Sequence, residues 1–132
     1  MDNSKHMRRK ICLIFFSITT LILFQLPVKA FNPCDDNSFE GSTRCLKLAK
    51  QGKTVAQASM ARKYTSGLGG IKANIDLGYM WGYIVVLKKP DDFAIRVLLD
   101  GLEKNYMNSK KISEIRRLAK ICIRSEFKNC PE

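Results

Sequence analysis

Apolar positions along the chain change their spacing and divide it into a leader and a series of short helices. An uncharged apolar run covers residues 11–26. Further along, apolar residues recur every three or four positions, the spacing that is typical of amphipathic helices. The sequence therefore predicts an all-α fold of about five helices, over residues 39–50, 54–65, 74–87, 91–106 and 110–126.

Residue types at the ends of these segments support the predicted boundaries. Gly52 follows the first helix as a left-handed cap, and Thr54 is a suitable N-cap for the second. Pro90 cannot continue the third helix. Asp91 and Asp92 suit the positive N-terminal end of the fourth helix, so we expect them to begin it.

The third predicted helix has no charged residue between Leu77 and Leu87, which predicts the most buried element of the fold. Gly78 and Gly82 lie inside it, where each glycine costs about 1 kcal/mol relative to alanine. We therefore expect other helices to cross close to both glycines. Trp81 is the large anchor of this helix, and its indole N–H is expected to find a partner such as a loop carbonyl.

The N-terminal segment has the features of a secretory signal peptide. Basic residues precede the apolar run, and Val28 and Ala30 occupy the small-residue positions before a cleavage site. We expect residues 1–30 to be removed after Ala30, which leaves one small domain over residues 31–132. The alternative is an uncleaved leader that anchors the chain in the inner membrane.

Charge changes the picture of the last helix. The whole chain has a formal net charge of +11, and the domain without its leader remains basic. Most of these cationic side chains are expected to be solvated at the surface without a binding role. On the last helix, however, they fall on one arc opposite its apolar stripe. This arc is either a solvated face or a contact for an anionic partner, and it consists of Lys110, Arg116, Arg117, Lys120 and Arg124.

Four cysteines remain once Cys12 is removed with the leader. An even number in an exported domain predicts two disulfides, and four cysteines allow three connectivities. The local pairing, in which Cys34 bonds Cys45 and Cys122 bonds Cys130, is favoured because each pair lies at one end of the chain. A zinc site would normally show closer C-x-x-C pairs. To join Cys122 and Cys130 the chain must reverse, and we expect this near residues 128–129.

The sequence offers few residues that are suited to catalysis. The only histidine, His6, lies in the leader, which argues against Ser-His-Asp and Cys-His catalysis and removes the commonest metal ligand. Cysteines in disulfides supply no thiolate. The acidic pairs Asp35–Asp36 and Asp91–Asp92 suit helix caps better than acid/base catalysis. We therefore expect a non-enzyme with no cofactor and no metal.

The segment between residues 52 and 81 resembles the Sel1-like repeat, an α/α unit related to the tetratricopeptide repeat. The family pattern places small, aromatic and glycine residues at fixed intervals. After one inserted glycine, Gly70, the pattern resumes with Ile71 and Asn74. The positions that carry the pattern are Gly52, Ala56, Met60, Ala61, Tyr64, Gly67, Gly69, Gly78 and Trp81. Four residues differ in type from the family pattern: Met60 replaces leucine, Ile71 valine, Asn74 aspartate and Gly78 alanine.

This resemblance implies a short right-handed α/α solenoid. Residues 39–52 look like a degenerate half-repeat, residues 52–89 like one complete repeat, and residues 91–132 like a C-terminal capping helix pair. Cys122 and Cys130 keep the C-x7-C spacing of cysteine-rich secreted members. With one complete repeat, the solenoid would depend on its caps and disulfides for stability.

What the resemblance implies about function is a non-catalytic exported scaffold, periplasmic or secreted from a bacterium, for a protein or peptide partner. Contacts are expected at the glycine loop of residues 67–70 with Tyr64, and at Tyr79 and Tyr83 where exposed. The alternative is a basic module that binds anionic envelope polymers or a membrane surface through Arg116, Arg117, Lys120 and Arg124. No nucleic-acid partner is expected.

Overall fold

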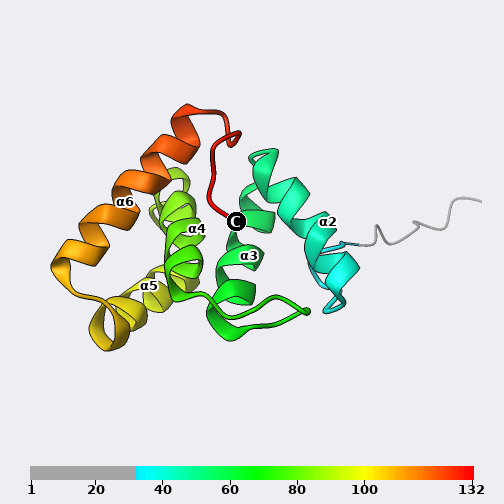
Figure 1. Cartoon of the computed structure of the whole chain (residues 1–132), viewed down its shortest axis with the longest axis horizontal. Coiled ribbons are helices and arrows are strands. Elements are labelled where there is room, and N and C mark those ends of the chain that lie inside the picture. The colour runs from blue at the N-terminus through cyan, green and yellow to red at the C-terminus, as the bar shows by residue number, and fades with distance from the viewer. Residues whose placement is uncertain (1–31) are drawn as a thin grey trace, which may run out of the picture. The chain divides into compact units, whose positions relative to one another are not determined.

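The computed structural model describes residues 32–132, so the predicted signal peptide lies outside the described residues. Within this range the chain is all-helical and has no strand, which confirms the predicted all-α class (Figure 1). The helices are α2 (Phe39–Lys50), α3 (Thr54–Ser66), α4 (Ile75–Lys88), α5 (Phe93–Tyr106) and α6 (Ser109–Arg124).

Most helix boundaries agree with the sequence to within two residues. Asn74 and Asp92 are N-caps, whose side chains accept hydrogen bonds from the backbone N–H groups of Leu77 and Ile95. The prediction that Thr54 is the N-cap of α3 was wrong. Thr54 already lies in the first turn, and the cap residue makes no side-chain hydrogen bond there.

The C-terminal end of α6 lies two residues before the predicted end. The helix ends at Arg124, and Glu126 and Phe127 follow with φ angles of 51° and 64°. These left-handed conformations are uncommon outside glycine. The turn begins at residue 125 and extends to residue 129, so it includes the predicted reversal near residues 128–129.

Helix α4 is the element against which α3, α5 and α6 assemble. It packs against α3, α5 and α6, whereas α2 packs against α3 (Figure 1). Residues 77–82 of α4 are all buried, which confirms the prediction from its uncharged sequence. Because α5 and α6 both pack on α4 and make few contacts with each other, a space remains between them.

The two glycines of α4 lie where neighbouring helices approach closely, as predicted. A Cβ atom at Gly78 would lie 3.1 Å from the Ala61 carbonyl oxygen of α3. A Cβ atom at Gly82 would lie 2.8 Å from Leu99 Cδ2 of α5. Both distances are shorter than ordinary van der Waals contact, so a side chain at either position would push a helix away from α4.

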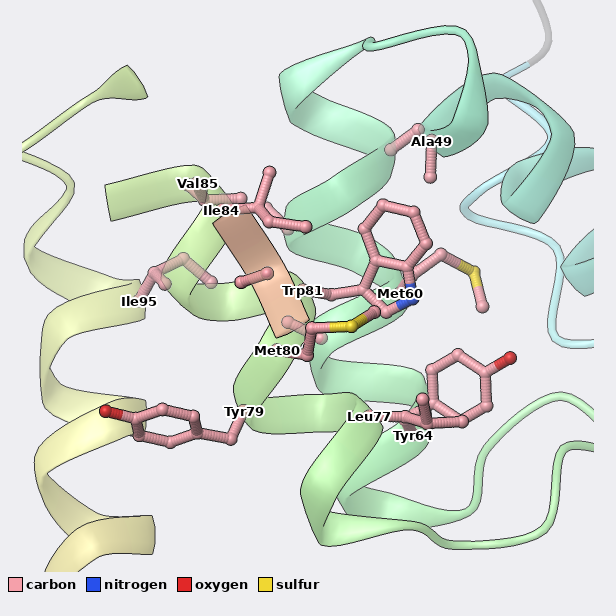
Figure 2. Packing of buried hydrophobic residues seen from close by; sticks show 14 of the residues in the cluster. Ala49, Met60, Tyr64, Leu77, Tyr79, Met80, Trp81, Ile84, Val85 and Ile95 are labelled. Carbon is pink, nitrogen blue, oxygen red and sulfur yellow. The ribbon is translucent and has the colours of Figure 1, made fainter. Parts of the chain in front are cut away.

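Trp81 is fully buried and lies beside Met60 of α3 in the core (Figure 2). Its indole Nε1 has no hydrogen-bond partner among the described residues. The expectation of a loop carbonyl partner was therefore wrong, because apolar side chains surround the ring. An unpaired buried N–H costs about 1–3 kcal/mol, which the burial of a side chain as large as tryptophan offsets.

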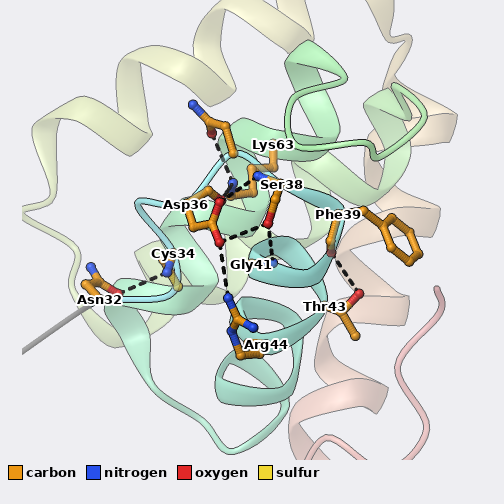
Figure 3. Close-up of polar contacts among 10 residues, drawn as sticks. Asn32, Cys34, Asp36, Ser38, Phe39, Gly41, Thr43, Arg44 and Lys63 are labelled. Atoms are coloured by element: carbon orange, nitrogen blue, oxygen red, sulfur yellow. Dashed lines mark hydrogen bonds and ion pairs between the residues drawn. The ribbon is translucent and has the colours of Figure 1, made fainter.

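A polar network holds the segment before α2 in place (Figure 3). Ser38 caps the helix, because its Oγ accepts a hydrogen bond from Gly41 N at 2.9 Å. Asp36 accepts from Ser38 N at 2.8 Å and from Ser38 Oγ at 2.9 Å, and Arg44 lies 3.1 Å from the same carboxylate. The hydrogen bond from the Ser38 backbone N–H is the largest of the effects that lower the pKa of Asp36.

One disulfide lies near each end of this domain, as the favoured local pairing predicts. Cys34 and Cys45 have Cα atoms 4.8 Å apart, and those of Cys122 and Cys130 are 4.6 Å apart. Disulfides persist in oxidising compartments, so these pairs indicate an exported environment. Between residues 32 and 132, no helix is both long and apolar enough to cross a membrane.

Alanine substitutions at two helical glycines should have opposite effects on stability. Gly78→Ala should lower the free energy of unfolding by about 1–3 kcal/mol, because the added methyl group collides with Ala61 and Thr65. Gly101→Ala should raise it by about 0.5–1 kcal/mol, because no atom lies within 4 Å of the added Cβ. Urea unfolding measures both values, and destabilisation of equal size at the two sites would contradict the close approach of α3 and α4.

Acid should remove the contribution of Asp36 to stability. Its pKa in the folded protein lies below the usual value of 3.8. The stabilisation is therefore present above that value and is lost as the pH falls through the lower folded-state pKa. We expect Asp36→Asn to be less stable than wild type near neutral pH, with a difference that shrinks in acid. Urea unfolding at several pH values measures the difference, and a gap independent of pH would contradict this assignment.

Candidate binding groove between helices α5 and α6

An open groove of about 750 Å³ lies between α5 and α6. Tyr83 of α4 and Glu103 of α5 contribute to its wall, and α6 supplies the other side. The groove exists because both helices pack on α4 rather than on each other. The residues of α6 that line it are Ser109, Ile112, Ser113, Arg116, Arg117 and Lys120.

The helical repeat explains why these residues share one side of α6. Ile112, Arg116 and Lys120 are spaced four residues apart, and Ser113 and Arg117 lie beside them. The core-facing stripe of α6 is different, because Ile115, Ala119 and Cys122 are buried against α4. Three residues of the predicted basic arc, Arg116, Arg117 and Lys120, therefore lie on one wall of the groove.

A hydrogen-bonded network fixes Arg116 at this wall. The Arg116 guanidinium donates from Nε to Tyr79 Oη at 2.8 Å and from a terminal nitrogen to Glu103 Oε1 at 2.7 Å. The Tyr79 hydroxyl in turn donates to the Glu103 carboxylate. Three helices thus contribute one side chain each. The network holds the guanidinium in one orientation, with less rotamer freedom than an isolated surface arginine.

Tyr79 acts in this network as a hydrogen-bond donor. Its side chain is fully buried and points from α4 toward α5 (Figure 2). Burial, and after it the hydrogen bond to Glu103, raise the pKa of Tyr79 to about 12. The phenol therefore stays protonated at neutral pH and is a poor base. What this cluster can do chemically is position a cation.

The ring of Tyr83, which is partly exposed, contacts both Tyr79 and Arg116 of this network. It stacks on Tyr79, with ring centroids 6.3 Å apart and planes 7° from parallel. The Arg116 guanidinium carbon lies 5.1 Å from the centroid of the Tyr83 ring. This cation–π contact fixes both side chains at the edge of the groove.

The groove carries an excess of positive charge. Arg116 is paired with Glu103, but the side chains of Arg117 and Lys120 are exposed. Neither of these two residues forms an ion pair within the described part of the chain. Anions that enter the groove would meet two cations whose charge no carboxylate neutralises.

The structure brings together some of the predicted contact residues and separates others. Tyr83, Arg116, Arg117 and Lys120 line the groove. Tyr79 is buried beneath it and cannot touch a partner, so its predicted role as an exposed contact residue is corrected. Two more candidates lie elsewhere: Tyr64 lines a separate hollow between α3 and α4, and Arg124 ends α6 without lining the groove.

The glycine loop after α3 supports the fold. Gly67, Gly69 and Gly70 all have φ angles of +68°. A Cβ atom at Gly69 would collide with Ser42 and lie 3.0 Å from Lys63 Nζ. Lys63 is itself buried and donates to the Asp36 carbonyl oxygen at 2.9 Å. The glycine loop and the segment before α2 therefore stabilise each other. The positive φ angles of the loop favour glycine at these positions.

Glu103 is the important residue that the sequence did not single out. It lies 13 residues before Arg116 and 24 after Tyr79. The available signal was an acidic residue next to Leu102, at the edge of the apolar stripe of α5. Among residues 32–132, no group of His, Cys, Asp and Glu side chains could hold a metal ion.

Comparisons of the chain with protein-family models, with curated proteins and with solved structures each found no match. The resemblance to Sel1-like repeats therefore rests on the residues quoted above.

Removing the Tyr79 hydroxyl should destabilise the protein. Tyr79→Phe takes away a donor to Glu103 and an acceptor for Arg116, which should lower the free energy of unfolding by about 1–2 kcal/mol. Tyr83→Phe is the matched control, with an expected change within about 0.5 kcal/mol, because the Tyr83 hydroxyl has no partner in the described structure. Urea unfolding measures both, and equal effects would contradict the network.

Proposed function

We propose that this protein is a non-catalytic, exported helical scaffold that binds an acidic segment of a protein or peptide partner in the groove between α5 and α6. The partner segment would place its carboxylates against Arg116, Arg117 and Lys120. An apolar side chain of the same segment would pack on Tyr83 and Ile112.

The observation that carries this proposal is the fixed position of Arg116 beside an open groove. A guanidinium held by Tyr79, Glu103 and Tyr83 needs little ordering when it meets a carboxylate. Pre-organisation of this kind lowers the entropy cost of binding. Arg117 and Lys120 add charge that steers an anionic segment toward the groove.

The finer architecture is part of the proposal. We infer a short right-handed α/α solenoid of the Sel1-like kind, with residues 52–89 as its complete repeat. The close packing of α3 on α4 at Gly78 and the burial of Met60, Tyr64 and Trp81 support this inference. Helical repeats of this class are scaffolds for contacts rather than catalysts.

The signal peptide and the final compartment are also part of the proposal. The two disulfides indicate an oxidising environment. We propose that residues 1–30 are a signal peptide and that the mature domain is periplasmic or secreted.

A peptide partner is favoured over an anionic polymer because the groove is not only basic. Tyr83 is half-buried and Ile112 lies among the cations. These two side chains offer an apolar contact that a uniformly charged polymer would leave unused. Protein partners provide carboxylates and apolar side chains in one segment.

Three labelled probes distinguish the two partner classes. They are a glutamate-rich peptide with one central phenylalanine, the same peptide with serine in that position, and polyphosphate. Fluorescence anisotropy at about 50 mM and about 500 mM NaCl measures binding to the disulfide-bonded protein. We expect the phenylalanine peptide to bind about tenfold more tightly than the serine peptide and to keep part of its affinity at high salt.

Paired variants on α6 locate the binding surface. Arg117→Gln with Lys120→Gln should weaken binding of the phenylalanine peptide about tenfold. The control is Lys110→Gln with Arg124→Gln, which removes the same charge from the same helix outside the groove and should change binding much less. Equal weakening by both pairs, or equal affinity for all three probes, would support the anionic-polymer alternative instead.

A further inference from the structure

The segment after α6 returns across the domain and touches elements far from it in sequence (Figure 1). We name residues 127–132 the C-terminal strap. The strap begins where Glu126 and Phe127 take left-handed φ angles of 51° and 64°. Each such angle is unfavourable for a residue with a side chain, so contacts beyond the turn must hold it.

Besides the hydrogen bonds of its first three backbone N–H groups to Cys122 and Ser125, three contacts hold the strap. The first is at Phe127, whose ring lies against the turn between α2 and α3, where a Cβ atom at Gly52 would be 3.2 Å from Phe127 Cε2. Lys88 Nζ, from the end of α4, lies 4.6 Å from the centroid of the same ring. At the other end of the strap, Glu132 forms an ion pair with Lys50 of α2.

The third contact is covalent. Cys130 of the strap is bonded to Cys122 of α6. The bond closes a short loop over the end of the helix, so Pro131 and Glu132 cannot move far from α6. Opening it would leave the start of the strap held by three local hydrogen bonds and by the Phe127 contact. Its end would be held by one partly exposed ion pair, which contributes little.

Two hollows lie beside the strap, and apolar and polar residues from α3, α4, α6 and the α3–α4 loop line them together with the strap. One hollow of about 240 Å³ is lined by Pro131 and Glu132 of the strap, by the apolar Leu77, Met80, Ile115 and Leu118, and by the polar Asn74, Asp76, Lys111 and Glu114. A second hollow of about 280 Å³ is lined by Glu132, Tyr64 and Leu77. Both hollows share Leu77 and Glu132, so removal of the strap would join them into one groove on α3, α4 and α6.

The two disulfides differ in the solvent exposure of their cysteines. Cys34, Cys45 and Cys122 are 6%, 0% and 0% exposed, whereas Cys130 is partly exposed. Thiol–disulfide exchange requires a thiolate to reach a sulfur atom. A reductant would therefore open the bond at Cys130 before the buried bond between Cys34 and Cys45.

We propose that the Cys122–Cys130 disulfide is a redox lock, and that the strap is the resident occupant of a peptide groove on α3, α4 and α6. A protein dithiol is the reductant. One of its thiolates attacks Cys130 Sγ, and Cys122 leaves and takes up a proton. The second thiol of the reductant then displaces Cys130, which also takes up a proton. The chain gains two electrons and two protons, and the dithiol becomes a disulfide.

Graded reduction tests the lock. The folded protein is treated with dithiothreitol, free thiols are alkylated, and mass spectrometry identifies the labelled cysteines. We expect Cys122 and Cys130 to be labelled at least tenfold faster than Cys34 and Cys45. Equal rates, or faster labelling of the N-terminal pair, would overturn the assignment of the lock.

Hydrogen exchange on the two-thiol form tests the release of the strap. The amides of Phe127 and Lys128 bond to the Cys122 and Ser125 carbonyl oxygens and should exchange at least tenfold faster after reduction. The amides of α3 and α4 should keep their protection. Unchanged protection of the strap, or loss of protection throughout the domain, would overturn the proposal.

A peptide competition tests the groove. The probe is a labelled peptide of residues 126–132 with serine in place of cysteine, and the proteins are the oxidised wild type and the Cys130→Ser variant. The variant should bind at least tenfold more tightly than the oxidised wild type. Should it fail to fold, the reduced wild type takes its place.

The ion pair at the end of the strap provides the matched control. Lys50→Gln in the Cys130→Ser background should weaken peptide binding severalfold, because Lys50 receives the Glu132 carboxylate. Lys47→Gln, on the exposed part of α2, should leave binding unchanged. Equal affinity of the peptide for the oxidised and open forms would overturn the groove, while leaving the proposed function of the α5/α6 groove untouched.

Discussion

The close approach of α3 and α4 is the constraint on which the rest of this structure depends. Gly78 lets the backbone of α4 come against Ala61 and Thr65 of α3, and this distance places Trp81 in the core beside Met60 (Figure 2). With α4 fixed in this way, its remaining sides are free to receive α5 and α6. Both binding surfaces proposed above are built on this one helix, which supplies Tyr79 and Tyr83 to one and Leu77 and Met80 to the other.

The sequence was informative wherever a feature depends on neighbouring residues. The absence of charge in α4 predicted its burial, and glycines at 78 and 82 predicted close helix crossings. The start and end of α2 were predicted without error. These features follow from helical periodicity and from the cost of glycine in a helix, both of which act over a few residues.

Features that join distant residues could not be predicted in the same way. The network of Tyr79, Glu103 and Arg116 depends on how α5 and α6 lie on α4, and no local pattern encodes that geometry. The left-handed φ angles of Glu126 and Phe127 are a similar case, because neither residue is a glycine. Contacts of Phe127 with the α2–α3 turn stabilise a conformation that local preference disfavours. The missing partner of the Trp81 indole also reflects its surroundings, in which apolar side chains from other helices exclude polar groups.

The packing of both α5 and α6 on α4 has a consequence for how such a chain can vary in length. Repeat proteins commonly grow by duplication, since each added unit stacks on the exposed face of the last one. Here a unit inserted between Lys88 and Phe93 would have to take the place of α5 against Gly82 and of α6 against Tyr79. It would separate Arg116 from its partners on α4. An insertion at this point of the chain would therefore break the contacts of α4 with α5 and α6.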